Sequence, residues 1–164
     1  MMNNRGYTLI ELMVVVAIIG ILSLVLGTSF QGTTAGYRIE DEVKELHADM
    51  MSARSRALEF KRIHFVQVNA GNYQIFDDAN QSGGIVPDGG DTALFSNPKT
   101  LSDNIIAGTG TYVMNTRGLV LLTPPSTPVP IRFDITTYTP DYDCILLSQT
   151  RINMGKWNGT CVVK

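Results

Sequence analysis

Apolar residues dominate the start of the chain in a pattern that predicts a long helix. The twenty residues from Tyr7 to Leu26 carry a single charge, that of Glu11. Because an α-helix rises about 1.5 Å per residue, about 20 such residues cross a hydrocarbon core of roughly 30 Å. A carboxylate inside such a segment costs on the order of 2.5–3.5 kcal/mol and usually has a partner and a role. The pattern therefore predicts a transmembrane helix over residues 7–30, with Glu11 as its candidate functional residue.

A second helical pattern covers residues 31–60. Its apolar residues recur at alternating steps of four and three, which is the spacing of one continuous stripe on an α-helix. They are Ile39, Val43, Leu46, Met50, Ala53, Ala57 and Phe60. The stripe predicts an amphipathic helix packed on its own domain. The charged residues of the opposite face, Arg38, Glu40, Glu42, Lys44, Glu45 and Asp49, are expected to be solvated, with Glu40 and Lys44 as a weak i,i+4 pair.

The segment from Gly27 to Gly36, rich in glycine, threonine and serine, separates the two patterns. Each glycine lowers helix stability by up to about 1 kcal/mol relative to alanine. Periodicity supports two helical halves without showing that they are continuous. We therefore expect bending or local melting between them.

Alternating patterns replace helical ones after Lys61. The runs from Ile63 to Val68 and from Tyr73 to Phe76 flank Gly71 and Asn72, which predicts a β-hairpin. A polar loop follows over residues 77–91, and later apolar runs predict strands at 111–114, 119–122, 131–135, 143–148 and 161–164. One helix followed by many strands indicates an α+β fold, in which the long helix packs on an antiparallel β-sheet head at residues 61–164.

Length and charge are consistent with one membrane helix and one small domain. The chain has 164 residues, and about 100 residues can bury a core unaided. Its 13 Lys and Arg against 15 Asp and Glu give a net charge of −2, which argues against bulk nucleic-acid binding but permits a local basic patch. Neither histidine, His47 or His64, has a nucleophile or carboxylate at a spacing that requires convergence, so no enzyme is predicted.

The two cysteines, Cys144 and Cys161, lie close together near the C-terminus. In an exported domain such a pair predicts a disulfide, and its loop of roughly 18 residues would contribute about 3 kcal/mol. A reduced pair or a metal site is the alternative, although no histidine neighbours either cysteine.

The residues before the apolar segment predict a processing site. Residues 1–6 form a short leader with one positive charge, Arg5, and a small final residue, Gly6. Arg5 predicts that the leader stays cytoplasmic while the rest of the chain is exported. Cleavage after Gly6 would create an ammonium group at Tyr7, one helical turn from Glu11. The alternatives are an ordinary secretory signal cut after the apolar segment and a plain single-span anchor.

The stretch Gly6-Tyr7-Thr8-Leu9-Ile10-Glu11 resembles the class III signal of type IV pilins and of the pseudopilins of type II secretion, with Tyr7 in place of the usual Phe. The resemblance implies cleavage by a prepilin peptidase, N-methylation of Tyr7, and storage in the bacterial inner membrane with the head in the periplasm. It also implies assembly with other pilin or pseudopilin subunits, in which residues 7–30 form the filament core and Glu11 pairs with a neighbour's Tyr7 amine.

Two head segments are similar to those of the GspH/FimT family of minor pilins and minor pseudopilins. They are residues 76–91 and Met114-Asn115-Thr116-Arg117-Gly118-Leu119. The family implies a β-rich head and a role in initiating or tipping a filament, with no catalysis. Both a type IV pilus and a type II secretion pseudopilus remain open.

The polar loop also contains a candidate calcium site. Asp78, Asn80 and Ser82 occupy the first, third and fifth places of an EF-hand-like loop, with Gly83 at the sixth. The twelfth place is Gly89 rather than a bidentate Glu, so a solvated surface loop is the alternative.

A candidate DNA contact lies between the cysteines. Some members of the resembled family act as DNA receptors in natural transformation through a Gly-Arg-x-Arg motif, of which this chain retains Arg151. Lys156 and Trp157 lie in the same predicted loop and offer a charge for phosphate and an aromatic face for a base. The alternative is that Trp157 packs on the sheet.

Overall fold

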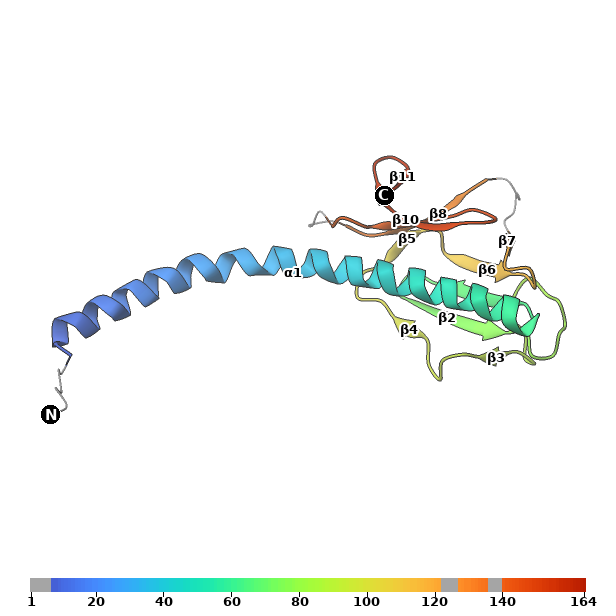
Figure 1. The fold of residues 1–164 in the computed structure, drawn as a ribbon, viewed down its shortest axis with the longest axis horizontal. Helices are drawn as coiled ribbons and strands as arrows, with labels where there is room; N and C mark the ends of the chain where they lie inside the picture. Colours follow the sequence, from blue (N-terminus) through green and yellow to red (C-terminus); the bar gives the residue numbers. More distant parts are fainter. Residues whose placement is uncertain (1–6, 122–126, 136–139) are drawn as a thin grey trace.

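The computed structural model describes residues 7–121, 127–135 and 140–164, without the side chains of residues 24–36. One long helix, α1 (Leu9–Phe60), is followed by a β-rich head. Figure 1 shows that the second half of α1 lies along the head while its first half projects well beyond it. The predicted α+β fold, a long N-terminal helix packed on antiparallel sheet, is confirmed.

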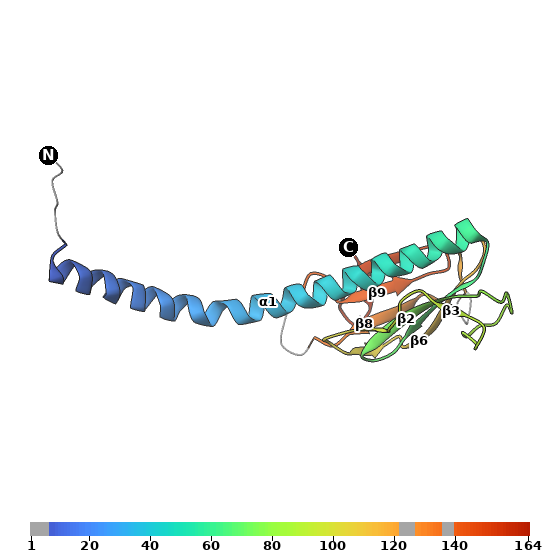
Figure 2. The same ribbon diagram turned by 90° about the horizontal axis from the view of Figure 1, so that it is seen from below.

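Helix α1 is continuous through Gly27 and Gly36, so the expected local melting between two helical halves is wrong. The helix curves gently along its length in both views (Figures 1 and 2). No proline interrupts the segment, and a glycine weakens a helix without removing a backbone hydrogen bond. The helix ends at Lys61, whose φ of 53° and ψ of 38° are left-handed, a common helix terminus.

The first sheet is built around the predicted hairpin. Its strands are β1 (His64–Val68), β2 (Asn72–Asp77), β3 (Thr92–Ala93), β4 (Lys99–Thr100), β6 (Gly110–Met114) and β7 (Val120–Leu121). Their order is β3-β2-β1-β6-β7, and β4 also pairs with β2. All pairs are antiparallel, with Phe65 opposite both Phe76 and Val113.

The second sheet contains β5 (Ile105–Ala107), β8 (Val129–Phe133), β9 (Cys144–Leu147), β10 (Ile152–Trp157) and β11 (Cys161–Val163). Its order is β11-β10-β9-β8-β5, again antiparallel. The sequence patterns predict no strand at the position of β10, which lies between β9 and β11. Its alternating apolar residues, Ile152 and Met154, are followed by Gly155 and Lys156, which weaken the strand pattern in the sequence. The short strands β3, β4 and β5 were not predicted either.

Helix α1 packs across both sheets, on β1 and β6 of the first and on β9 and β10 of the second. Six residues of the predicted stripe, from Ile39 to Ala57, are fully buried in one core together with residues from both sheets. Phe60 is the exception, with 51% of its surface exposed. It is the last residue of α1, and the stripe therefore ends one turn earlier than the periodicity indicates.

The charged residues beside the stripe contact the head, which the sequence did not predict. The Glu42 carboxylate accepts hydrogen bonds from the backbone N–H groups of Ser102 (2.8 Å) and Asp103 (3.4 Å). Lys99 on β4 binds Glu45 at 2.7 Å and Asp49 at 2.6 Å. The expectation of a solvated face is therefore wrong for these residues, because they flank the stripe closely enough to reach the loops and strand around it.

Other polar groups of α1 extend this set of contacts. Glu40 accepts a hydrogen bond from the Asp141 N–H at 2.6 Å and pairs with Lys44 at 3.3 Å, as predicted for that i,i+4 pair. Arg38 binds Asp103 at 3.1 Å, and His47 Nε2 lies 3.0 Å from the Ile152 carbonyl oxygen. Polar contacts on both sides of the stripe therefore define how the helix is seated on the two sheets.

Candidate functional site

The N-terminal turn of α1 positions the residues predicted for processing and assembly. Thr8 is the N-cap, with extended backbone (φ −78°, ψ 152°), and its Oγ1 accepts a hydrogen bond from the Glu11 N–H at 3.3 Å. Glu11 thus lies in the first helical turn, where a carboxylate interacts favourably with the helix dipole. Tyr7 is 79% exposed, and Gly6 lies outside the described residues.

The capping role of Thr8 is a feature that the sequence analysis does not assign. The signal was present, because Thr8-Leu9-Ile10-Glu11 has the Thr-x-x-Glu spacing of a capping box just before an apolar run. Of the two bonds of that motif, the structure contains the one from the Glu11 N–H to the Thr8 hydroxyl. The predicted processing motif therefore also contains the N-cap residue of α1.

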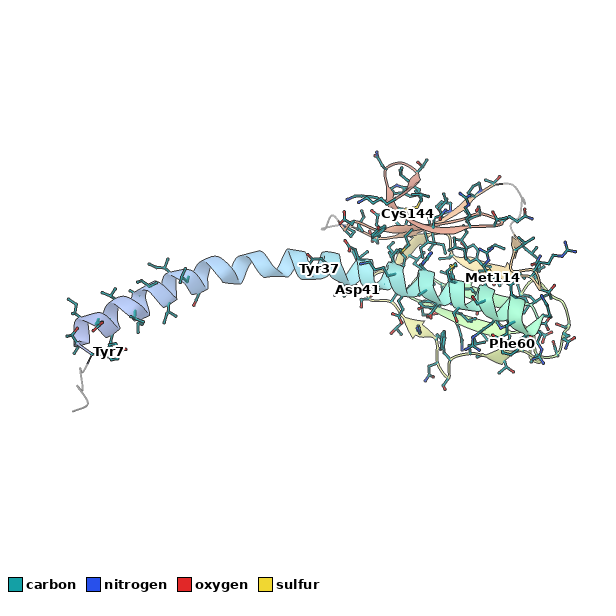
Figure 3. All side chains as sticks on the ribbon, in the orientation of Figure 1. Tyr7, Tyr37, Asp41, Phe60, Met114 and Cys144 are labelled. Carbon is teal, nitrogen blue, oxygen red and sulfur yellow. A yellow bond between two sulfur atoms is a disulfide. The ribbon has the colours of Figure 1, made fainter. Side chains whose placement is uncertain are left out.

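Apolar side chains surround the first half of α1 and are exposed on every side. Between Leu9 and Leu22 the large aliphatic side chains are 47–76% exposed. Leu9, Leu12, Met13, Val16 and Ala17 line a shallow apolar groove on one side. A helix that is apolar all round is buried in its functional state, in protein or in lipid. Figure 3 shows these side chains standing clear of the head.

Within the part of the chain whose side chains are described, no helix combines the length and the apolar character needed to cross a membrane.

The predicted disulfide between Cys144 and Cys161 is present, with Cα atoms 6.0 Å apart. It joins β9 to β11, which are not neighbours, and passes over Gly155 of the intervening β10. A Cβ atom at Gly155 would approach the Cys161 Sγ to 3.1 Å and would collide with the Val162 carbonyl oxygen. The bond therefore fixes the last strand to the middle of the second sheet.

The three residues predicted as a DNA contact are not brought together. Arg151 precedes β10 and is exposed, whereas Trp157 ends the strand, about 20 Å away at roughly 3.3 Å per residue. The Lys156 ammonium donates to the Pro140 carbonyl oxygen at 2.9 Å, and the Arg132 guanidinium lies 4.8 Å from the Trp157 ring centre. Trp157 thus packs on the sheet, which is the alternative to a DNA contact given in the sequence analysis.

Arg151 instead lies beside the end of α1. The Arg54 guanidinium donates to the Thr150 carbonyl oxygen at 2.8 Å, which joins the helix to the turn between β9 and β10. The Val120 N–H donates to the Gln149 carbonyl oxygen at 2.9 Å, so the turn between β6 and β7 is close as well. This grouping could not be read from the sequence, because its members come from three distant segments.

Hydrogen bonds within the polar loop engage the residues of the candidate calcium site. Asp78 is buried, and its two carboxylate oxygens accept hydrogen bonds from the backbone N–H groups of Ser82 (2.9 Å) and Gly83 (3.1 Å). The Asn80 side chain accepts from the Ser82 N–H and donates to Asp88. Among the described residues, no three His, Cys, Asp or Glu side chains converge as metal ligands. Asp78, Asn80 and Ser82 therefore organise the loop itself.

A buried histidine adjoins this loop. His64 is 1% exposed, its Nδ1 lies 3.4 Å from the Arg62 carbonyl oxygen, and its Nε2 lies 4.0 Å from the Asp77 carboxylate. Burial lowers the pKa of His64 below its usual value, and this effect exceeds the opposing influence of the Arg62 carbonyl and of Asp77. Arg62 pairs with Asp77 at 3.2 Å, so the carboxylate already has a cationic partner.

Comparisons with known proteins agree with the N-terminal geometry. Residues 1–27 match the family model described as the prokaryotic N-terminal methylation motif. Two relatives, both described as a fimbrial protein of Pseudomonas aeruginosa, are 44% identical over 63 residues, which is 38% of this chain. The matched stretch spans 41% of the length of each relative. No solved structure matches the chain.

The family match covers the part of the chain that contains Tyr7, Thr8 and Glu11. The N-terminal methylation motif of type IV pilins is therefore present, and it supports a pilin-like subunit. The matches provide no support for one particular subfamily of minor pilins.

Proposed function

We propose that this chain is a minor pilin or pseudopilin, a structural subunit that initiates or tips a type IV pilus or a type II secretion pseudopilus. The observation that carries the proposal is the exposed apolar surface of α1 between Leu9 and Leu22, with Glu11 as its single charge. An aliphatic surface of this extent is covered by lipid or by other subunits in the functional state. The N-terminal methylation motif over residues 1–27 supports the same function.

Processing comes first in the proposed mechanism. A prepilin peptidase removes residues 1–6 by cleaving between Gly6 and Tyr7, and the new amine of Tyr7 is then methylated. Before assembly, residues 7–30 hold the subunit in the bacterial inner membrane, with the head in the periplasm. The helix dipole and the Tyr7 ammonium group stabilise the charge of Glu11 during storage.

Assembly then replaces lipid contacts by contacts between helices. Glu11 pairs with the Tyr7 ammonium of a neighbouring subunit, and the apolar side chains of both helices pack in the filament core. A carboxylate in an apolar surface strongly favours the one register that gives it a cationic partner, because every other register leaves the charge unpaired.

Replacing Glu11 by alanine tests this mechanism. We expect Glu11→Ala to be cleaved normally, so that mass spectrometry finds a mature chain beginning at Tyr7. Its incorporation into filaments should fall by about tenfold, the effect of losing a charge-assisted bond worth roughly 1.5 kcal/mol. Glu59→Ala, at the exposed other end of α1, is the matched control.

Two results would contradict the proposal. Normal recruitment of Glu11→Ala would remove the pairing mechanism. A mature chain beginning at Thr28 would show cleavage after the apolar segment, as in an ordinary secretory signal, and would remove the pilin function altogether.

A DNA-binding minor pilin, acting in DNA uptake, is the second candidate function. The observation that favours it is the exposed Arg151 beside Arg54 at the end of α1. Lys156 and Trp157 do not contribute, because their side chains contact Pro140 and Arg132 within the head.

A further inference from the structure

Three arginines from distant parts of the chain lie around one corner of the head. Arg54 is on α1, Arg117 is in the turn between β6 and β7, and Arg151 directly precedes β10. We call this set the arginine corner. Its members are separated by up to 97 positions in the sequence, and only the fold assembles them.

Contacts with α1 hold the two turns in place. Arg54 donates to the Thr150 carbonyl oxygen at 2.8 Å, which sets the position of the turn that precedes Arg151. One helical turn further along the same face, Leu58 packs so closely on Gly118 that a Cβ atom there would lie 2.9 Å from the leucine Cγ. Arg117 is the neighbour of Gly118 and is exposed, as Arg151 is.

The arginine corner has few nearby acidic groups to neutralise it. Among the described residues, the side chains of Arg117 and Arg151 make no hydrogen bond or ion pair. The acidic loop of residues 78–91 joins β2 to β3, at the opposite edge of the first sheet from β7. Exposed guanidinium groups without an ion-pair partner bind carboxylates well, because the two groups form two parallel hydrogen bonds.

Carboxylates outnumber cations at one end of the head. The end near residues 38–49, with the segments bonded to it, contains eight carboxylates and five cations. The carboxylates are Glu40, Asp41, Glu42, Glu45, Asp49, Asp103, Asp134 and Asp141, and the cations are Arg38, Lys44, Lys99, Lys156 and Lys164.

The far end carries six cations, Arg54, Arg56, Lys61, Arg62, Arg117 and Arg151. Its five carboxylates are Glu59 on α1 and, in and beside the loop after β2, Asp77, Asp78, Asp88 and Asp91. Figure 3 places Asp41 and Phe60 at the two ends of the part of α1 that lies on the head. The head is therefore acidic where α1 enters it, while at the other end the first sheet separates the arginine corner from the acidic loop of residues 78–91.

One carboxylate at the acidic end is available for a partner. Asp41 is exposed and makes no hydrogen bond or ion pair within the described part of the chain. Glu45 lies one helical turn away on the same face, with 56% of its side chain exposed. The other carboxylates of α1 at this end are largely occupied by Lys99, Lys44 and the loop N–H groups.

We propose that the arginine corner of one subunit binds the Asp41 and Glu45 face of a second copy of this chain. Such a contact joins two different surfaces, so it is heterologous and can continue from subunit to subunit in an open helical array. The inference rests on the proposed function, because it specifies which surfaces of the heads meet when subunits assemble. A polyanion fits less well, because the chain has a net charge of −2.

The experiment uses the full chain in two tagged forms, expressed together and recovered in mild detergent. Both forms carry the same substitutions, because a heterologous contact would otherwise persist through the unchanged surfaces. The measured quantity is the amount of one tagged form that is purified together with the other. We expect the double substitution Arg117→Glu and Arg151→Glu to reduce this amount by about tenfold at low salt. Adding Asp41→Arg to both forms should restore most of the recovery.

The matched control makes the same change of charge at the same end of α1. Arg56→Glu with Lys61→Glu replaces two exposed cations outside the arginine corner and should leave recovery within about twofold of the original chain. An equal loss in this control, or no loss in the corner variant, would overturn the inference. A loss without restoration by Asp41→Arg would also overturn it.

Failure of the proposed function gives a different result, a mature chain that begins at Thr28. If two unsubstituted copies are not recovered together, only the inference is wrong, because a subunit that initiates or tips a filament can assemble with other subunits instead. If they are recovered together and the corner variant behaves like them, only the inference is wrong. A third result would assign the arginine corner to nucleic acid instead. In that case the original chain binds duplex DNA, the corner variant does not, and the two tagged forms of the variant are still recovered together as before.

Discussion

At Gly155 a single missing side chain allows a disulfide to cross a strand. The bond from Cys144 on β9 to Cys161 on β11 passes over the middle strand, and Gly155 lies beneath it. Any Cβ atom there meets the Val162 carbonyl oxygen, which belongs to the backbone and cannot rotate away. The glycine is therefore required by packing rather than by its backbone angles.

We predict that Gly155→Ala destabilises the head by about 1–3 kcal/mol, the usual cost of overpacking. The free energy of unfolding, measured by urea denaturation with the disulfide intact, checks this value. Gly89→Ala is the control, because a Cβ atom there meets nothing within 4 Å, and we expect a change within about 0.5 kcal/mol. Equal stabilities of the two variants would contradict the packing argument.

His64 should make the head less stable in mild acid. Burial lowers its pKa below 6.5, so the unfolded chain takes up a proton at this position at a higher pH than the folded chain does. The free energy of unfolding should therefore fall as the pH drops below about 7, by at most about 1.4 kcal/mol per pH unit from this group. The loss should be complete below the lowered pKa.

Urea denaturation of the original chain and of His64→Gln at pH 7.5 and pH 5.5 measures this effect. The variant should lose less stability between the two pH values than the original chain. His47→Gln, which removes the other histidine, is the control. An unchanged pH dependence in His64→Gln would contradict the prediction.

At the scale of elements, α1 packs on the head through a buried apolar stripe that has polar contacts on both sides. The stripe residues from Ile39 to Ala57 are fully buried, and both sheets contribute to the same core. Periodicity predicts such a stripe well, because burial on one face repeats with the helical turn. It does not predict that Glu42 binds two loop N–H groups, because that contact depends on where the loop passes.

Two methionines that are adjacent in the sequence lie on different faces of α1. Met50 is fully buried and Met51 is 39% exposed. We predict that Met50→Ala lowers the free energy of unfolding by about 2–5 kcal/mol, whereas Met51→Ala changes it by roughly 0.5 kcal/mol. Thermal unfolding of both variants provides the measurement, and similar melting temperatures would show that the helix is seated on another face.

At the scale of the whole molecule, the two halves of α1 have different environments. Every described side chain from Tyr7 to Ser23 is exposed, whereas the contacts with the head include Arg38 and Ile39. The head therefore contains its own core and includes the second half of the helix. The first half remains available for other subunits or lipid.

We predict that a chain beginning at Tyr37 folds as a soluble domain. Its melting temperature should lie within a few degrees of that of the full chain in detergent, because the removed residues make no described contact with the core. Circular dichroism and sedimentation velocity check the fold and the mass. An unfolded product would show that the first half of α1 stabilises the head.

The amino-acid sequence alone determined the elements whose signals are local. The apolar segment with Glu11, the stripe from Ile39 to Ala57, the hairpin and the cysteine pair are each visible within a few neighbouring residues, because helical turn, strand alternation and loop closure act over short distances. Only the tertiary structure decided that α1 continues through Gly27 to Gly36, that β10 runs beneath the disulfide, and that Trp157 packs on Arg132. The arginine corner belongs to the same class, since Arg54, Arg117 and Arg151 meet through contacts between segments far apart in the sequence, and such contacts leave no periodic pattern along the chain.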